Sequence, residues 1–341
     1  MAAPSYFYAS VTRCSDLWQR PFEVLPLPRN RWRGGDFVVG EVSGQPNPLY
    51  RCETKTGRMA ELVPGDRIIG ALGEREATLE GVGSWRAIGE DGRMDGLTGA
   101  GLFGRATSIS SLLPPFMQLG YRGHATRAGA PLNMADFVLP EPPAAPAVPI
   151  VLVIGTSMSA GKTTSARIII RELRALGLKV VAGKVTGAAR YRDILSFRDA
   201  GAEAVFDFVD EGLPSTVCAP ELYAPALERM LARIGAQRPD AAVIEAGASP
   251  LEPYNGDLAL ARILPETRMT LLCASDPYAV LGVQSAFGLR PDLVGGPAAN
   301  TTAAVALVQR LVGLPALNLL DAAARPTLRA MLAARLGIGE G

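Results

Sequence analysis

A glycine-rich stretch at 155–164, GTSMSAGKTT, contains the residue types that bind the phosphates of a nucleotide. The backbone amides of such a loop hold phosphate oxygens, Lys162 can reach the terminal phosphate, and the Thr163 hydroxyl can join a Mg²⁺ shell. The common spacing is G-x-x-x-x-G-K-[ST], whereas five residues separate Gly155 from Gly161 here. We therefore predict a phosphate-binding loop of unusual spacing. Its expected nucleotide contacts are Gly155, Thr156, Ser159, Ala160, Gly161, Lys162, Thr163 and Thr164.

Two further charged residues stand at the ends of apolar runs. Glu245 follows four apolar residues in AAVIEAGASPLEP, where a buried charge is unfavourable unless a cation or a hydrogen-bond donor meets it. This favours a metal-binding role over that of a capped carboxylate at a strand end. Lys184 ends the run VVAGKV and could bridge a substrate carboxylate and the γ-phosphate, or it could be an exposed lysine closing a strand. Lys162, Lys184 and Glu245 are the expected catalytic residues.

Arginines and aspartates follow Lys184 along the chain. Arg190 and Arg192 could place cationic donors around an anionic substrate and stabilise a transferring phosphoryl group, or they could belong to a solvated helix face. Asp207 and Asp210, in FDFVDEG, are the nearest further carboxylates for Mg²⁺. The expected metal ligands are Thr163, Glu245 and Asp207.

The second half of the chain alternates buried-strand and helical patterns, which predicts an α/β domain with a parallel sheet covered by helices. Ligands of such sheets bind at the carboxyl ends of the strands, where these motifs lie. In 162–177 the apolar residues recur at helical spacing before Gly177. The expected strands are 150–155, 179–185, 241–247, 269–275 and 315–320, and the expected helices are 162–177, 224–235 and 301–313.

The first half contains short β-like runs punctuated by glycine, proline and aspartate, which predicts a small β-barrel or sandwich. Residues 96–108 are expected to form a glycine-rich loop on it. The expected domains are a β-rich domain at 1–138, a proline- and alanine-rich linker at 139–149, and a P-loop α/β domain at 150–341. The β-like runs are 22–27, 36–42, 67–73 and 77–83.

The composition narrows the class of protein. The chain has 341 residues, 48% of them hydrophobic, and a net charge of +1, which is typical of a globular protein and does not indicate a nucleic-acid or membrane partner. The four cysteines form no C-x-x-C pair and the first residues lack the order of a signal peptide, so we expect a cytoplasmic protein. The single histidine, His124, lies among glycines and arginines and is expected in a solvated loop. One histidine argues against a histidine-rich zinc site.

The loop GTSMSAGKTT resembles the nucleotide loop of dethiobiotin synthetase, which begins G-T and closes V-G-K-T. That family belongs to a class of P-loop proteins with MinD-like ATPases and cobyrinate amidases. VVAGKVTG resembles its K-P-V-x-T-G motif, and AAVIEAGASPLEP resembles its E-G-A-G-G-x-x-x-P motif, in which the glutamate holds Mg²⁺. The resemblance, with the two arginines above, implies that the substrate contacts are Thr186, Gly187, Arg190, Arg192, Gly247, Ala248 and Ser249.

The family also implies a base-recognition residue and shows where this chain departs. Asn300, in PDLVGGPAANT, matches an asparagine that recognises the adenine edge, although it could equally be a helix N-cap. Ser157 stands where the synthetase loop has a magnesium-binding aspartate, and the β-rich first domain has no counterpart in that family. Dethiobiotin synthesis itself is therefore not predicted.

About half of the chain is more similar to a bacterial family formerly known as a domain of unknown function, some members of which are linked to N-acetylation of D-glutamate. The matching residues are Thr186-Gly187 before AARYRD, Asp207-Phe208-Val209, and Glu245 to Ser249 with Pro253 and Tyr254. The first domain of that family is a nucleotide-binding α/β unit, which differs from the β-rich pattern here.

Three functions remain open. The first is an ATP- and Mg²⁺-dependent ligase or kinase that activates a small, amino-acid-like carboxylate by phosphoryl transfer. The second, implied by the D-glutamate relatives, is an N-acyltransferase that binds acyl-coenzyme A. The third is a nucleotide-switched binding or metallocentre-delivery protein, although the loop lacks a second, early lysine. Resemblance to the synthetase also implies a homodimer.

Overall fold

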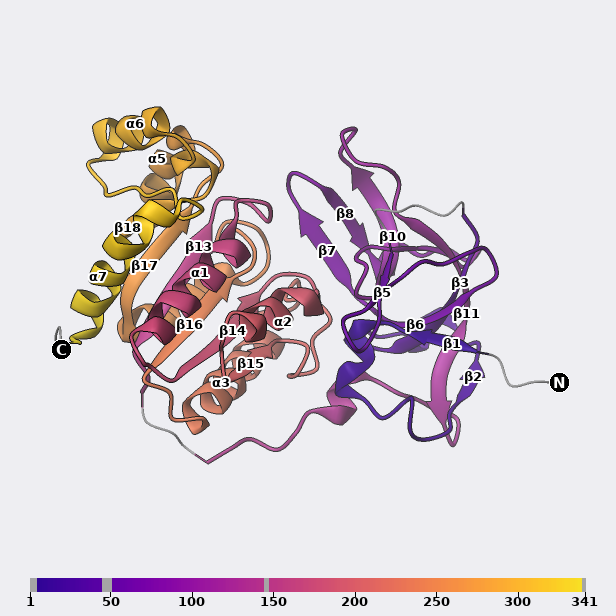
Figure 1. The fold of residues 1–341 in the computed structure, drawn as a ribbon. Coiled ribbons are helices and arrows are strands. Elements are labelled where there is room, and N and C mark those ends of the chain that lie inside the picture. The colour runs from indigo at the N-terminus through magenta and orange to yellow at the C-terminus, as the bar shows by residue number, and fades with distance from the viewer. Residues whose placement is uncertain (1–4, 45–50, 144–146, 339–341) are drawn as a thin grey trace. The chain divides into compact units, whose positions relative to one another are not determined.

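The computed structural model describes residues 5–44, 51–143 and 147–338, so residues 144–146 of the expected linker lie outside the described residues. The chain forms two compact units. The first, the barrel unit, contains Met1–Pro140 together with Ala188–Arg192 and Phe208–Ala226. The second, the α/β unit, contains Glu141–Gly187, Asp193–Asp207 and Leu227–Gly341. Figure 1 shows the elements of both, and each unit is described by itself.

The strands of the barrel unit close a ring. Strand β6 pairs with β3, β3 with β11, β11 with β9 and β9 with β10, and β10 pairs again with β6. All these pairs are antiparallel except β10–β6. The expected β-rich region is therefore confirmed, and of the two expected architectures it is a barrel. The strands are β1 Tyr6–Tyr8, β2 Glu23–Leu25, β3 Phe37–Val42, β4 Cys52–Glu53, β5 Met59–Ala60, β6 Arg67–Leu72, β7 Glu74–Ala77, β8 Gly81–Ser84, β9 Arg93–Gly96, β10 Leu102–Ile109, β11 Met117–Arg127 and β12 Ala130–Pro131.

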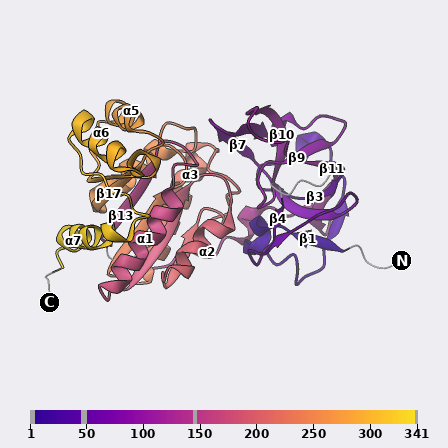
Figure 2. The same ribbon diagram turned by 45° about the horizontal axis from the view of Figure 1, so that its top comes forward.

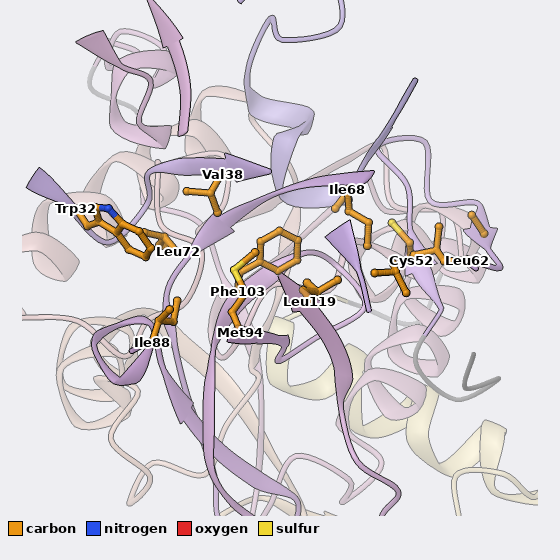
Figure 3. Packing of buried hydrophobic residues seen from close by; sticks show 13 residues of the cluster. Trp32, Val38, Cys52, Leu62, Ile68, Leu72, Ile88, Met94, Phe103 and Leu119 are labelled. Atoms are coloured by element: carbon orange, nitrogen blue, oxygen red, sulfur yellow. The ribbon is translucent and has the colours of Figure 1, made fainter. Parts of the chain in front are cut away.

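Alternate residues of β3 and β6 pack into two separate cores, because successive side chains of a strand point to opposite faces. Ile68 packs with Met94, Phe103 and Leu119 in one cluster, which Figure 3 shows. Ile69 packs in a second cluster that also contains residues from much later in the chain. These later residues are Ala189, Phe208, Val209 and Leu213. The barrel unit thus needs segments of the second half of the sequence to complete its core.

Two expectations for the barrel unit are wrong. The run 77–83 is not one strand but spans the turn between β7 and β8. The expected loop at 96–108 is largely strand β10, in which Leu102 and Phe103 are buried. Its Gly104 is required by close packing, since a Cβ there would lie 2.8 Å from the backbone of Ser84.

His124 is not in a solvated loop, because it is fully buried on β11. Its Nδ1 shares a hydrogen bond of 2.6 Å with the Tyr121 hydroxyl, and its Nε2 lies 3.5 Å from Asp36 Oδ2. Asp36 also accepts hydrogen bonds from the Arg33 amide and from the Asn133 side chain. The sequence around His124 is rich in glycine and arginine, which conceals a strand residue that points inward.

The α/β unit has a six-stranded parallel sheet in the order β15-β14-β16-β13-β17-β18. Helix α1 packs against β13, β14 and β16, and α7 packs beside α1 and against β17; Figure 2 shows both helices. The expected class, a helix-covered parallel sheet with a β-rich region before it, is confirmed. The strands are β13 Ile150–Gly155, β14 Val180–Thr186, β15 Ala204–Asp207, β16 Ala241–Ala246, β17 Thr267–Cys273 and β18 Leu293–Gly295.

The helices are α1 Lys162–Ala175, α2 Tyr191–Asp199, α3 Pro220–Ala236, α4 Gly256–Ile263, α5 Pro277–Phe287, α6 Thr302–Val312 and α7 Arg325–Leu336. The three expected helices correspond to α1, α3 and α6, whereas α2, α4, α5 and α7 were not among them. The strand expected at 315–320 is wrong, because only Ala316 forms an isolated bridge, with Val294. The Asn318 side chain accepts the amide of Leu320 and turns the chain there. Within the described residues, no helix has both the length and the apolarity that a membrane crossing requires.

Candidate functional site

The loop between β13 and α1 is shaped by its glycines. A Cβ on Gly155 would lie 2.8 Å from Cγ and Cδ of Lys162, so the lysine side chain folds back over a residue without a side chain. Gly161 has a φ of +89°, in the left-handed region that favours glycine, and it directly precedes α1. A Cβ on Gly296 would lie 2.4 Å from the Ala160 carbonyl oxygen. The loop therefore lies between a strand and a helix, as a phosphate site requires. The glycines leave room for the fifth residue between Gly155 and Gly161.

Lys162 is buried and its ammonium group is held by the loop itself. Its side chain is 1% exposed, and Nζ donates a hydrogen bond of 2.5 Å to the Ser157 carbonyl oxygen. Burial lowers the pKa of Lys162, and the nearby Glu245 carboxylate acts in the opposite direction. Ser157 thus contributes a backbone oxygen and no charge.

Thr163 and Glu245 form the second part of the site. The Thr163 hydroxyl donates a hydrogen bond of 3.2 Å to Glu245 Oε1. Glu245 is 1% exposed, and its Oε2 atom is buried without a hydrogen-bond partner among the described residues. Burial raises the pKa of Glu245, while Lys184 acts to lower it. A buried carboxylate oxygen without a partner is unfavourable, so this atom fits a site completed by a cation.

The sheet register places three charged residues side by side. Lys184 on β14 lies directly opposite Glu245 on β16 and Asp207 on β15. Asp207 is 1% exposed at the end of its strand. The ammonium group of Lys184 pairs with Asp193 Oδ2 at 2.5 Å, and both side chains are largely buried. The expected Lys184, Glu245 and Asp207 are therefore brought together at the carboxyl edge of the sheet.

The residues present fit a magnesium ion that also uses ligands from a bound substrate. Within the described parts of the chain, no three His, Cys, Asp or Glu side chains cluster closely enough to hold a metal by themselves. Mg²⁺ commonly keeps several waters and binds through one or two carboxylates and substrate phosphates. Thr163 supplies a hydroxyl oxygen and Glu245 a carboxylate oxygen, and both are oxygen ligands that suit Mg²⁺.

A pocket of about 150 Å³ lies beside the loop. Asn300 lines it together with Ser159, Gly161 and Thr164 of the loop region. The alternative role of Asn300 as a helix N-cap is wrong, because Thr301 caps α6 by accepting the amide of Ala304. The remaining lining residues are Ser165, Ile168, Gly296, Pro297, Leu319 and Leu320, so none of the lining side chains is charged.

The expected substrate residues divide between the two units. Thr186 and Gly247 follow Lys184 and Glu245 at the strand ends, where the Thr186 carbonyl accepts the Gly247 amide at 3.0 Å. Ala248 donates to the Thr186 hydroxyl at 3.5 Å. Gly187 and Ser249 also belong to the α/β unit, whereas Arg190 and Arg192 belong to the barrel unit. The α/β unit thus brings the small residues together without the arginines.

Within the barrel unit these arginines flank a helix start. The amides of Tyr191 and Arg192 donate to Glu53 at 2.7 and 3.1 Å. Asp210, considered as a carboxylate for magnesium, lies in the same unit and forms an ion pair of 3.0 Å with Arg13.

Two residues at the site were not expected from the sequence. Asp193 pairs with Lys184, and the buried Glu252 carboxylate accepts the Ser249 amide at 2.7 Å. Glu252 is close enough to Lys162 to raise its pKa. Asp193 follows two arginines in a helical segment, which is typical of a solvated face. Glu252 lies in a proline-flanked loop. The sequence therefore did not indicate that the side chain of Asp193 or of Glu252 is buried.

No protein-family model matches the sequence, and no curated protein matches it. Solved structures that are similar include a DUF1611 family protein from Anabaena variabilis, 17% identical over 57% of this chain and 63% of that chain, with a TM-score of 0.38. The signal recognition particle receptor FtsY from Elizabethkingia anophelis in complex with GDP is 15% identical over 54% of this chain and 62% of that chain, with a TM-score of 0.37. HypB from Helicobacter pylori in complex with nickel is 14% identical over 56% of this chain and 88% of that chain, with a TM-score of 0.37. The chain thus spans less than two thirds of the first two proteins.

Proposed function

We propose that the α/β unit binds ATP with Mg²⁺ and transfers the γ-phosphoryl group to a small carboxylate substrate. The observation that carries this proposal is the buried Glu245 carboxylate, with one oxygen on the Thr163 hydroxyl and the other without a partner. Such a carboxylate destabilises the fold unless a cation completes its surroundings. Its position beside the first turn of α1 supports a cation bound together with phosphate.

The loop supplies the phosphate contacts in this proposal. Helix α1 has no side-chain cap and no acidic residue in its first turn, so its amide groups and positive dipole end are available to an anion. The Lys162 ammonium group, which donates to a loop carbonyl at 2.5 Å, can turn to a phosphate oxygen. The exchange replaces a neutral acceptor with a charged one, which strengthens the hydrogen bond.

The uncharged pocket beside the loop supports adenine as the base. Asn300 is its one carboxamide side chain, and a carboxamide both donates and accepts, which matches the N6 and N7 atoms of adenine. Guanine presents two adjacent donors on its Watson–Crick edge, for which a carboxylate is the better partner. Since no lining side chain is a carboxylate, we expect ATP to bind more tightly than GTP.

Lys184 supports a carboxylate as the acceptor. It lies directly opposite Glu245 at the strand ends, where its ammonium group can orient an anionic substrate. A substrate carboxylate oxygen attacks the γ-phosphorus, the bond to the β–γ bridging oxygen breaks, and ADP and an acyl phosphate form. Lys162 and Lys184 stabilise the charge of the transferring group. Thr163 and Glu245 would hold Mg²⁺, which supplies charge neutralisation and orientation of the phosphates.

The test is calorimetric titration of the protein with Mg-ATP, Mg-GTP and acetyl-coenzyme A. Lys162→Ala should weaken ATP binding by about 100-fold or more, because a charge-assisted hydrogen bond to phosphate is lost. Lys179→Ala is the matched control, since Lys179 immediately precedes β14 at the opposite end of that strand. ADP release is then screened against small carboxylates, and only the right one should produce it.

Each alternative result has a clear meaning. Full ATP affinity in Lys162→Ala would contradict the phosphate-loop assignment. Saturable binding of acetyl-coenzyme A without ATP binding would contradict phosphoryl transfer and favour an acyltransferase.

A further inference from the structure

Lys184 lies next to Glu245 in the sheet but does not bond to it. The two residues are directly opposite on adjacent strands, which are spaced about 4.8 Å apart. A lysine side chain is long enough to cross that gap, and Glu245 Oε2 has no hydrogen-bond partner among the described residues. The Lys184 ammonium group instead forms a 2.5 Å ion pair with Asp193 on α2.

Two glycines define the path of the Lys184 side chain toward Asp193. A Cβ on Gly247 would lie 2.3 Å from Lys184 Cε, and a Cβ on Gly187 would lie 3.4 Å from the same atom. The aliphatic part of Lys184 therefore occupies a slot that exists because Gly247 lacks a side chain, while a Cβ on Gly187 would only reach van der Waals distance. Asp193 meets the ammonium group at the end of this slot, and its carboxylate is close enough to Glu245 to act on the pKa of that residue.

We propose that Asp193 is a positioning residue that holds the Lys184 ammonium group away from Glu245 and so keeps Glu245 Oε2 open for a divalent cation. This inference rests on the proposed function. Without the Asp193 carboxylate, the buried ammonium group would turn to Glu245, its neighbour in the sheet. That pairing removes negative charge from the cation site.

The experiment compares nucleotide binding with and without metal. Mn²⁺ replaces Mg²⁺ as the probe, and calorimetry gives the affinity for Mn-ATP and for ATP in the presence of EDTA. In Asp193→Asn, the gain in affinity that Mn²⁺ provides should fall 10–100-fold, as for residues that orient metal ligands, while metal-free ATP binding changes little. Asp193→Glu should restore most of the gain because it keeps the counter-ion.

A double variant separates this role from a structural one. Lys184→Met combined with Asp193→Asn removes the ammonium group that would otherwise occupy Glu245. The Mn²⁺-dependent gain should therefore return to within about threefold of the wild-type value, well inside the 10–100-fold loss expected of the single variant. Merely disturbed packing around α2 would leave the double variant as weak as Asp193→Asn, and that result would overturn the inference.

Other outcomes are equally decisive. An unchanged Mn²⁺-dependent gain in Asp193→Asn, with wild-type binding of Mn-ATP that Lys162→Ala removes, would overturn the role of Asp193 alone. Absence of Lys162-dependent Mn-ATP binding in the wild-type protein would overturn the proposed function and this inference with it.

Discussion

Two buried glutamates, one in each unit, differ in the number of hydrogen bonds that their carboxylates accept. Glu53 in the barrel unit is 2% exposed and accepts three hydrogen bonds, from the Ser10 hydroxyl and from the amides of Tyr191 and Arg192. Glu245 in the α/β unit is 1% exposed and accepts one, from Thr163. The fold satisfies the first carboxylate, whereas one oxygen of the second has no hydrogen-bond partner in the described part of the chain. Burial is thus common to both carboxylates, and incomplete hydrogen bonding is the feature that sets Glu245 apart.

The contrast is specific to the two glutamates, because buried polar atoms without a hydrogen-bond partner occur among the described residues of both units, such as His124 Nε2 in the barrel unit. In the barrel unit, Tyr121, His124 and Asp36 contact one another inside the fold, and Asp36 is further held by Arg33 and Asn133. In the α/β unit, polar groups converge on the strand ends beside an uncapped helix start. The polar groups of the two units therefore differ in where they lie, because those of the α/β unit gather beside a helix start that has no side-chain cap.

The sharpest test of this comparison replaces each glutamate with glutamine. In Glu53→Gln, the side-chain NH₂ group would face backbone N–H groups, and two donors cannot bond to each other. The substitution should therefore destabilise the protein by about 3 kcal/mol. For a unit of this size the midpoint should fall by roughly 6–12 °C. Glu245→Gln should leave the unfolding free energy unchanged or raise it by up to about 1 kcal/mol, because a desolvated charge is removed while the bond from Thr163 is kept.

Thermal and chemical unfolding in metal-free buffer measure both variants against the wild-type protein. Destabilisation of Glu245→Gln equal to that of Glu53→Gln would show that the fold satisfies both carboxylates, and the comparison would fail.

The sequence predicts those residues of the site whose positions follow from the strand and helix patterns directly around them. Lys162 and Thr163 begin helix α1 and Glu245 lies near the end of strand β16, and the strand and helix patterns around them are strong. The alignment of Lys184 with Glu245 follows from parallel strands ending at one edge. Asp193 could not be predicted, since its pairing with Lys184 depends on how α2 packs against the sheet. The second barrel core could not be predicted either, because Phe208 and Val209 join it from a distant part of the chain.

Buried thiols offer a second test, because each unit contains one. Burial raises the pKa of Cys52 to about 12 and that of Cys273 to about 11, so neither reacts with a maleimide at pH 8 until its surroundings open. Cys273 ends β17, next to the loop between β13 and α1, where its carbonyl accepts the amide of Thr156. Mg-ATP at 100 times its Kd should slow the labelling of Cys273 by about 100-fold and leave that of Cys52 unchanged.

Labelling is followed by mass spectrometry of peptides from the unmodified chain. Equal protection of both thiols would mean that the two units open together, and protection of Cys52 alone would place the nucleotide in the wrong unit.

The smallest expected effect distinguishes backbone strain from ligand binding. Gly161 in the loop and Gly65 in the barrel unit have φ values of +89° and +95°, and an added Cβ would meet no atom closer than 3.7 Å at either position. Alanine at each should therefore cost about 1–2 kcal/mol of stability, since the left-handed backbone is the only penalty. Only Gly161→Ala should also weaken ATP binding, by about tenfold, because relief of strain there turns loop amides away from the phosphates. Unfolding curves and ATP titrations of the two variants measure both effects. Equal stability losses with equal ATP affinities would mean that the loop amides do not hold the nucleotide, whatever Lys162 does.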